Sequence, residues 1–417
     1  MDNCDSLGPT PIQLSSSFVS PLLSHAHEHI RLAALTLTIH SPTPTKPLPT
    51  SAFRVLKSEL PPLHAETDAE VRNLVIGSMR QLIERLGSTS YALDKDLQGL
   101  EKSALRLPKD QTIPLKILGL KESITEAASF LSWYLNFLKT QLAPGANYQR
   151  VVTALRILIM IIRSGVDPSL VSPDDKAGKK KGLLHWPPSV QVDLFDKTMK
   201  RVLIDCLFNP FDDVRTMATE VLKFAPDCGG SLRIILERGL RGMNTSGRAR
   251  DADGVARSID LWFHFALKYS PEAKFEELWG LTVSAPSDQL CAVDWVLRVL
   301  ELDYLKVARE DFQRAVRERP IYGLLSGLRL IFEGRGIYEC AFKGPAGKFI
   351  ISQILEYCVD IWRMSKDILC FVSPEGYVPQ EMIDEEAGED GDDGMDTQTV
   401  MSYCWRAIKE SRCASIG

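Results

Sequence analysis

The sequence lacks the motifs of common nucleotide-binding and hydrolytic enzymes. It has no Gly-x-x-x-x-Gly-Lys-Ser/Thr phosphate loop, no Gly-x-Gly-x-x-Gly after a strand and no Gly-x-Ser-x-Gly elbow. Strand patterns are scarce, and without alternating strands and helices no crevice for a nucleotide or a methyl donor is expected. We therefore predict that the chain does not methylate, reduce or phosphorylate by itself and has no small-molecule substrate.

Metal-binding and disulfide patterns are missing as well. The nine cysteines are odd in number, scattered and never spaced as Cys-x-x-Cys, which argues against a disulfide framework and a zinc site. His25, His27 and His29 alternate next to Glu28, but they lack the His-Glu-x-x-His order. A polar helix start is favoured over a metal pair, so the sequence predicts no metal and no cofactor.

Long apolar runs are absent too. The most apolar run, residues 151–162, contains Arg156 and is too short to cross a bilayer, so we predict a buried helix there and no membrane partner. The first ten residues resemble neither a secretory signal nor a transit peptide. Together with the reduced cysteines, this predicts a cytoplasmic location.

Charge is distributed unevenly along the chain. The formal charge is −5, but residues 381–396 hold nine acids and no Lys or Arg, which leaves the rest of the chain at +4. Like charges repel, so we expect residues 373–399 to form an acidic disordered loop. Residues 164–188, rich in Lys, Pro and Gly, are expected to form a flexible basic insertion. Either segment can be a solvated linker or a partner contact.

Helix patterns, in contrast, are abundant and repeat. A hydrophobic residue followed by arginine recurs at a helix start at Arg31, Arg72 and Arg215, with looser copies at Arg150 and Arg257. The intervals of 41, 78, 65 and 42 residues are about one or two times the period of roughly 40 to 47 residues in two-helix HEAT or armadillo units. We expect Arg31, Arg72 and Arg215 to pair with acids on adjacent helices and to set the packing of successive units.

The fold class predicted is therefore all-α, a HEAT/armadillo-like helical repeat solenoid. The clearest helix follows Thr67, where residues 67–70 match a capping box. Its apolar stripe is expected to comprise Val71, Leu74, Val75, Met79, Leu82, Ile83 and Leu86. The predicted organisation is repeats over 1–163, the basic insertion over 164–188, repeats over 189–372, the acidic loop over 373–399 and a truncated C-terminal helix over 400–417.

A cluster of arginines is the main candidate for nucleic-acid contact. It consists of Arg238, Arg241, Arg248, Arg250 and Arg257. Such a cluster can neutralise phosphates, although solvated helix ends and ion pairs within a repeat explain the same residues. We keep Arg248, Arg250 and Arg257 as candidates for binding RNA or a partner.

Several stretches resemble a known family. They are Trp-Tyr-Leu-Asn-Phe-Leu at 133–138, Leu-Ala-Pro-Gly-Ala-Asn-Tyr-Gln-Arg at 142–150, the block containing Cys-Trp-Arg-x-x-Lys-Glu at 398–410, and His-Ile-Arg-Leu-Ala-Ala-Leu at 29–35. In their order along the chain they resemble the central region of the thyroid adenoma-associated protein family. The resemblance implies a large helical repeat protein.

The resemblance also implies a function. Fungal members of that family act as the non-catalytic subunit of a tRNA 2'-O-methyltransferase, helping an FtsJ-like enzyme to modify ribose 32 of the anticodon loop. The expected partners are thus that enzyme and tRNA. Family members are longer, and their Arg-Arg-Ser-Ala-Gly-Leu-Pro segment does not occur in this sequence, so we expect a fragment.

The block at 398–410 supplies the remaining candidates. Trp405 and Lys409 lie one helical turn apart, as do Arg406 and Glu410. An aromatic ring beside a cation can grip RNA or a partner, whereas core packing of Trp405 with an Arg406–Glu410 ion pair is the structural alternative. Two other functions remain open: a general protein-interaction scaffold in trafficking or transport, and a truncated fragment without function.

Overall fold

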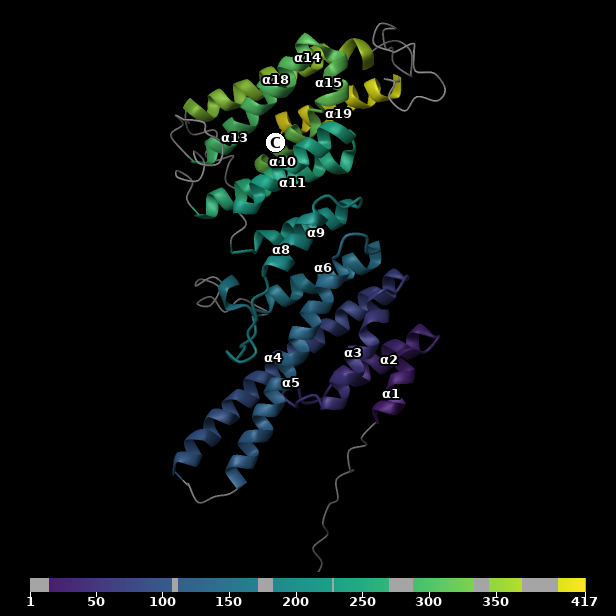
Figure 1. The fold of residues 1–417 in the computed structure, drawn as a ribbon, viewed down its shortest axis with the longest axis vertical. Coiled ribbons are helices and arrows are strands. Elements are labelled where there is room, and N and C mark those ends of the chain that lie inside the picture. Colours follow the sequence, from purple (N-terminus) through teal and green to yellow (C-terminus); the bar gives the residue numbers. More distant parts are fainter. Residues whose placement is uncertain are drawn as a thin grey trace, which may run out of the picture. The chain divides into compact units, whose positions relative to one another are not determined.

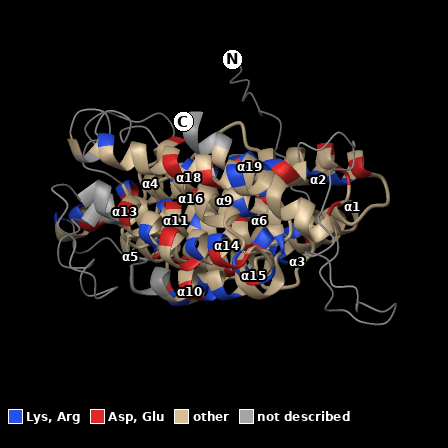
Figure 2. Ribbon diagram, turned by 90° about the horizontal axis from the view of Figure 1, so that it is seen from above, with Lys and Arg blue, Asp and Glu red and all other residues tan. Residues whose placement is uncertain are grey.

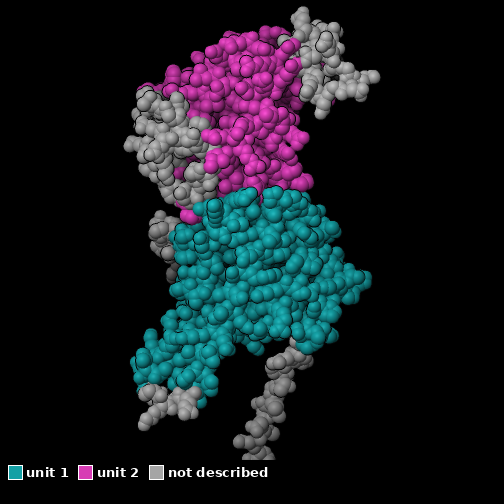
Figure 3. Space-filling view, viewed as in Figure 1, with its two compact units in different colours: residues 1–202 teal, residues 203–417 magenta. Residues whose placement is uncertain are grey.

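In the computed structural model every regular element of the described residues is helical. The described residues are 15–106, 112–171, 183–226, 229–269, 288–333, 345–369 and 397–416. They belong to two units, residues 1–202 and 203–417 (Figures 1 and 3). The predicted all-α helical-repeat fold is confirmed.

The described residues of unit 1 form six α-helices and one short 3-10 turn before the start of α8. They are α1 (Ser16–Leu23), α2 (Glu28–Ile39), α3 (Thr50–His64), α4 (Ala69–Arg106), α5 (Thr112–Gln141), α6 (Tyr148–Arg163) and η1 (Pro168–Leu170). Helix α6 buries nine of its residues, including Leu155 and Ile161. The prediction that residues 151–162 form a buried helix is therefore confirmed.

Unit 2 begins within α8 (Lys197–Cys206), which crosses the boundary between the units. Its other helices are α9 (Asp212–Lys223), α10 (Gly229–Ser246), α11 (Ala249–Tyr269), α13 (Asp288–Val299), the π-helical η2 (Leu300–Leu305), α14 (Lys306–Glu310), α15 (Phe312–Glu318), α16 (Tyr322–Glu333), α18 (Pro345–Leu369) and α19 (Thr397–Ile416).

The start of α4 differs from the predicted capping box. Asp68, and not Thr67, caps the helix, because its carboxylate accepts hydrogen bonds from the backbone N–H groups of Glu70 (2.8 Å) and Val71 (2.9 Å). The apolar stripe is buried as predicted except at Leu74, whose side chain is exposed.

Three of the repeated arginines make the same contact. Arg31, Arg72 and Arg215 are each the fourth residue of their helix, α2, α4 and α9. Each donates from Nη1 to the carbonyl oxygens six and five residues earlier, over 2.5–3.1 Å. The guanidinium group thereby binds two carbonyls of the loop that leads into its own helix, which fixes the angle between loop and helix.

Ion pairs with acids add to this contact at two of the three positions. Arg31 pairs with Glu66 at 2.5 Å, in the turn between α3 and α4, and Arg215 pairs with Asp253 of α11 and, at 3.2 Å, with Asp212. Arg72 instead binds its two carbonyls. Pairing with an adjacent helix, predicted for all three, is thus confirmed at Arg215.

The looser copies do not share this geometry. Arg150 is the third residue of α6 and is exposed, and Arg257 is the ninth residue of α11. From there Arg257 pairs at 2.8 Å with both Asp253 and Asp212. The position of the arginine within the helix therefore decides whether it reaches back to the loop.

Helices α4 and α5 extend beyond the other helices of unit 1 as a two-helix hairpin (Figure 1). After Leu93, α4 has no buried residue, and α5 has none between Ile113 and Ile124. An ion pair between Lys121 and Glu101, at 2.9 Å, links the two helices there. This part of the hairpin packs against itself.

The ends of the predicted basic insertion pack on unit 1. Val166 and Trp186 are buried, and the Trp186 indole donates to the carbonyl of Ser164 at 3.1 Å. Only residues 172–182 of the insertion lie outside the described residues. Residues 370–396, with most of the predicted acidic loop, also lie outside them, and α19 begins at Thr397, three residues before the predicted helix.

Two glycines of α16 allow close packing in unit 2. A Cβ atom on Gly323 would lie 3.0 Å from the backbone oxygen of Ala252 in α11, and one on Gly327 would lie 2.8 Å from Ile259. Because no side chain fills this space, α16 packs directly on α11. This fixes the position of the neighbouring Tyr322.

The arginine contact predicts a stability effect. We expect Arg215→Ala to lower the free energy of unfolding of unit 2 by about 2–4 kcal/mol, because two loop carbonyls lose their donor and Asp253 loses a buried partner. The control Arg150→Ala, at an exposed position, should change it by less than about 0.5 kcal/mol. Urea unfolding of the two variants tests this, and equal midpoints would contradict it.

A buried histidine in unit 1 predicts a pH dependence. His64 contacts the hydroxyl of Tyr134 at 3.1 Å, and burial lowers the pKa of His64 from 6.5 to about 3. Between these values the unfolded chain binds a proton that the folded chain does not, so stability decreases as pH falls.

The expected decrease is about 1.4 kcal/mol per pH unit between pH of about 6 and about 4. It should be smaller in His64→Gln than in the wild type, whereas His29→Gln, at an exposed histidine, should follow the wild type. Urea unfolding at a series of pH values measures the three slopes. Identical slopes for all three would show that His64 is not the cause.

Candidate functional site

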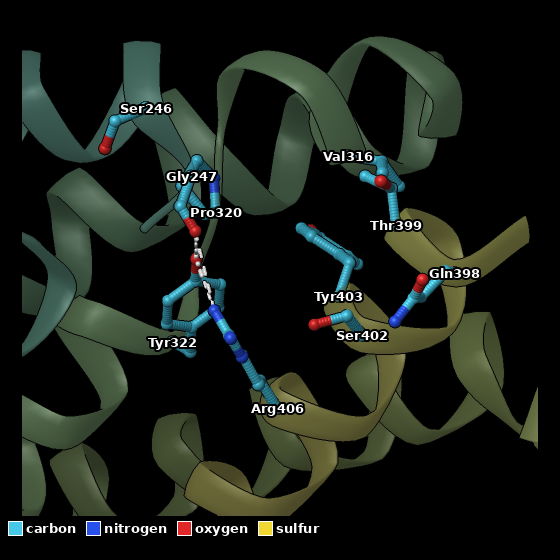
Figure 4. Close-up of a pocket in the computed structure, with 10 residues that line it drawn as sticks. All are labelled: Ser246, Gly247, Val316, Pro320, Tyr322, Gln398, Thr399, Ser402, Tyr403 and Arg406. Carbon is cyan, nitrogen blue, oxygen red and sulfur yellow. Dashed lines mark hydrogen bonds between the residues drawn. The ribbon is translucent and has the colours of Figure 1, made fainter. Parts of the chain in front are cut away.

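A pocket of about 320 Å³ lies in unit 2 beside the first half of α19 (Figure 4). The end of α10 with the turn after it, the end of α15, the start of α16 and α19 all contribute to its wall. The lining residues are Ser246, Gly247, Val316, Pro320, Tyr322, Gln398, Thr399, Ser402, Tyr403 and Arg406.

One side of the pocket is organised around the carbonyl of Gly247. Gly247 ends α10 in the left-handed conformation (φ +57°), which glycine adopts without strain. Its carbonyl accepts a hydrogen bond from the hydroxyl of Tyr322 at 2.7 Å and a longer one from Arg406 at 3.4 Å. The Arg406 guanidinium also lies over the Tyr322 ring, 5.2 Å from its centre. These contacts hold Arg406 at the edge of the pocket (Figure 4).

Tyr403 contributes a polar atom without a partner. Its ring packs edge-on against Phe312 of α15, with 5.7 Å between ring centres. Its side chain is 4% exposed, and the buried hydroxyl makes no hydrogen bond to the described residues. Burial raises the pKa of Tyr403. Buried polar atoms are usually paired, so this hydroxyl has the capacity to bind a ligand group.

The lining favours binding over catalysis. Among the described residues, the lining contains no His, Cys, Asp, Glu or Lys. The pKa values of Tyr322 and Tyr403 are raised by burial, so neither phenol releases its proton near neutral pH. A general acid or base works best when its pKa lies near the working pH. The pocket therefore offers one positive charge, several hydroxyl groups and an amide.

The three cysteines whose side chains the structure describes are not activated. Cys206 and Cys404 are buried and Cys358 is half-buried, and none of the three is in a disulfide. Burial raises the pKa of Cys206 to about 12 and the pKa values of Cys358 and Cys404 to about 11. All three are protonated at neutral pH, and the thiol is a poor nucleophile.

The four candidates on α19 have different surroundings in the structure. Trp405 is 57% exposed, and the ammonium group of Lys409 lies 5.1 Å from the centre of its ring, so the shared face of the two residues is confirmed. Core packing of Trp405 is wrong. The alternative ion pair between Arg406 and Glu410 is also wrong: Glu410 accepts hydrogen bonds from Ser326 (2.8 Å) and Arg329 (3.4 Å) of α16.

The arginine cluster divides in a similar way. Arg257 lies in the ion pairs of α9 and α11 described above, and Arg250 lies 3.6 Å from Asp251. Arg238 lies 3.6 Å from Asp205, and Arg241 donates to the carbonyl of Glu237. Arg248 is exposed and follows the lining residue Gly247 in the chain. Arg406 is the candidate whose side chain lines the pocket.

Lysines and arginines alternate with acidic residues along the described helices. In Figure 2 basic and acidic positions are interspersed along the helices. Within the described ranges, three or more His, Cys, Asp or Glu side chains never converge in a way that could hold a metal ion. The same ranges contain no helix that is both long and apolar enough to span a bilayer.

Sequence reasoning missed most of the pocket. Gly247, Pro320 and Tyr322 come from turns and helix ends that carry no motif, and they meet because α16 packs closely on α11. The block at 398–410 did contain Arg406 and Tyr403, but only the structure shows which side chains face the pocket and which face solvent.

These features define a helical-repeat protein that offers a binding surface and a small polar pocket. Residues 6–216 match the family model described as Trm732, TPR repeats, and residues 349–414 match the model described as THADA/TRM732, DUF2428. The first match covers half of the chain, so the protein belongs to the Trm732 TPR-repeat family. The resemblance to the thyroid adenoma-associated protein family is thereby confirmed. The matching family model names TPR repeats over residues 6–216. The HEAT or armadillo type of the repeats stays a prediction.

A curated relative extends the match. The chain is similar to the tRNA (32-2'-O)-methyltransferase regulator trm732 of Schizosaccharomyces pombe, with 25% identity over 404 residues. The alignment covers 95% of this chain and 24% of the relative. The chain thus spans about a quarter of the length of that relative.

The surface position of Trp405 can be tested by its effect on stability. We expect Trp405→Ala to change the free energy of unfolding by less than about 0.5 kcal/mol, because more than half of the side chain is exposed. Tyr403→Ala, two residues earlier and buried, should lower it by about 3–5 kcal/mol. Thermal unfolding of both variants measures this, and a large loss in Trp405→Ala would place Trp405 in the core.

Proposed function

We propose that this chain is part of a non-catalytic scaffold subunit that supports 2'-O-ribose methylation of tRNA at anticodon-loop position 32. An FtsJ-like methyltransferase partner carries out the chemistry, and the complex works in the cytoplasm. The observation that carries the proposal is the match over 95% of the chain to a protein named as a regulator of a tRNA (32-2'-O)-methyltransferase.

The described residues support a positional role. Stacked helices present long surfaces to partners, and the described residues that line the pocket in unit 2 are polar and apolar side chains with one arginine, which suits binding. A scaffold that holds enzyme and tRNA together makes their bimolecular encounter effectively unimolecular. This raises the rate of methylation, although the scaffold takes no part in the chemistry. The methyl-donor pocket would belong to the partner.

The test is reconstitution with the partner. We expect the tagged chain to recover an FtsJ-like methyltransferase together with tRNA, and its addition to raise the rate of ribose methylation at position 32 by the purified enzyme. The measurement is methylation of tRNA at this ribose with and without the chain. A deletion strain with normal methylation at position 32 would refute the proposal.

A general protein-interaction scaffold is the second candidate. Apolar side chains are exposed on the outer part of the α4–α5 hairpin, at Leu105, Leu115 and Leu118. Exposed apolar groups that lie together commonly mark protein-binding sites. Recovery of protein partners that is insensitive to ribonuclease, without a methyltransferase, would favour this candidate.

A further inference from the structure

We propose that the pocket beside Arg406 binds one unpaired nucleotide of RNA, with the base in the pocket and the phosphate near Arg406. The inference rests on the proposed function, in which tRNA is a partner, and assigns to one site of this chain a part in binding it. Size, an unpartnered buried hydroxyl and the placement of positive charge support it independently.

The size of the pocket fits a single small group. Its volume of about 320 Å³ is at the lower end of the range of about 300–1,000 Å³ that ligand pockets usually have. A helix or strand of another protein needs a groove, and a duplex needs an open surface. A single base that is turned out of an RNA loop can enter a pocket of this size. Such a base is neither paired nor stacked, so no neighbouring base has to enter with it.

The walls suit a base. Val316, Pro320 and the ring of Tyr403 give an apolar surface against which a flat aromatic group can pack. In Figure 4 the Tyr403 ring projects from α19 toward the space enclosed by the labelled residues. Its hydroxyl is buried without a partner, and a base carries donors and acceptors along its edge. A bound base can satisfy this hydroxyl, which costs free energy as long as it is unpaired.

The edge of the pocket suits a phosphate. Arg406 makes two long hydrogen bonds there, to the Gly247 carbonyl at 3.4 Å and to the Tyr322 hydroxyl at 3.3 Å. A phosphate oxygen offers a shorter, charge-assisted bond. Gln398, in the first turn of α19, lines another part of the pocket and offers an amide donor.

A neighbouring surface favours RNA over a free nucleotide. Trp405 is exposed on α19 next to Arg406, with Lys409 over its ring. Stacked aromatic rings beside cations are the usual binding platform for single-stranded RNA. A strand that places one nucleotide in the pocket can stack the next on Trp405.

Four variants of the full 417-residue chain separate the parts of the site. Ser402→Trp fills the pocket from a half-exposed position, Arg406→Ala removes the charge at its edge, and Tyr403→Phe removes only the unpaired hydroxyl. The control is Arg363→Ala on α18, which removes an equal charge from a side chain that is 71% exposed, elsewhere in unit 2. Thermal unfolding shows which variants are folded, and Tyr403→Phe is expected to be as stable as the wild type.

Binding is measured by fluorescence anisotropy with a labelled anticodon stem-loop RNA and with a blunt-ended RNA duplex that has no unpaired nucleotide. We expect Ser402→Trp and Arg406→Ala to weaken binding of the stem-loop about tenfold, and Tyr403→Phe about fivefold. Arg363→Ala should bind as the wild type does, and the duplex should not distinguish the variants. Wild-type affinity in folded Ser402→Trp and Tyr403→Phe would overturn the inference, as would a wild-type chain that does not bind the stem-loop.

The same proteins are assayed with the methyltransferase, so that the two proposals can fail separately. If the wild-type chain stimulates methylation at position 32 and folded Ser402→Trp does so equally at limiting tRNA, the pocket inference fails while the proposed function stands. If the wild-type chain neither recovers nor stimulates the enzyme, the proposed function fails. A raised KM for tRNA in Ser402→Trp with unchanged kcat supports the inference.

Discussion

Arginine reaching back to the loop before its own helix is the contact on which the helical arrangement depends. At Arg31, Arg72 and Arg215 the guanidinium group binds the carbonyls five and six residues earlier. Loop carbonyls without a partner would be costly once helices pack over them. A single side chain removes this cost and fixes where each helix starts, and Arg215 also ties α9 to α11 through Asp253.

Helices α16 and α11 of unit 2 pack closely because glycines stand at their contact. Gly323 and Gly327 bring α16 onto α11, and Gly247 ends α10 with its carbonyl directed at Tyr322. Together these glycines leave Tyr322 and Arg406 in one place on the pocket wall. The pocket thus lies where the ends of α10, α15 and α16 meet the side of α19. Loop backbone and side-chain hydroxyl groups line it, and no continuous apolar core of described residues fills the space.

The sequence predicted the helices better than it predicted the pocket. Hydrophobic spacing located α4 because its buried face follows the helical period, and the apolar run at residues 151–162 located α6. It did not tell Leu74, which is exposed, from its buried neighbours, since that depends on which helices lie opposite. The spacing of Arg406 and Glu410 suggested a mutual pair, but each finds a partner on α16 instead. Tertiary neighbours at large sequence separation decided these positions, and no local pattern encodes them.

The long hairpin of α4 and α5 has a dynamic consequence. Beyond Leu93 and before Ile124 its two helices bury few residues and rely on each other. Such segments open at a lower free energy than the body to which they are attached. Amide hydrogens in the outer turns should exchange with solvent long before those of α6, and an enzyme that cleaves exposed chain should cut there first. Unit 1 therefore combines a well-packed body with an outer α4–α5 segment that can adjust its conformation when a partner binds to it.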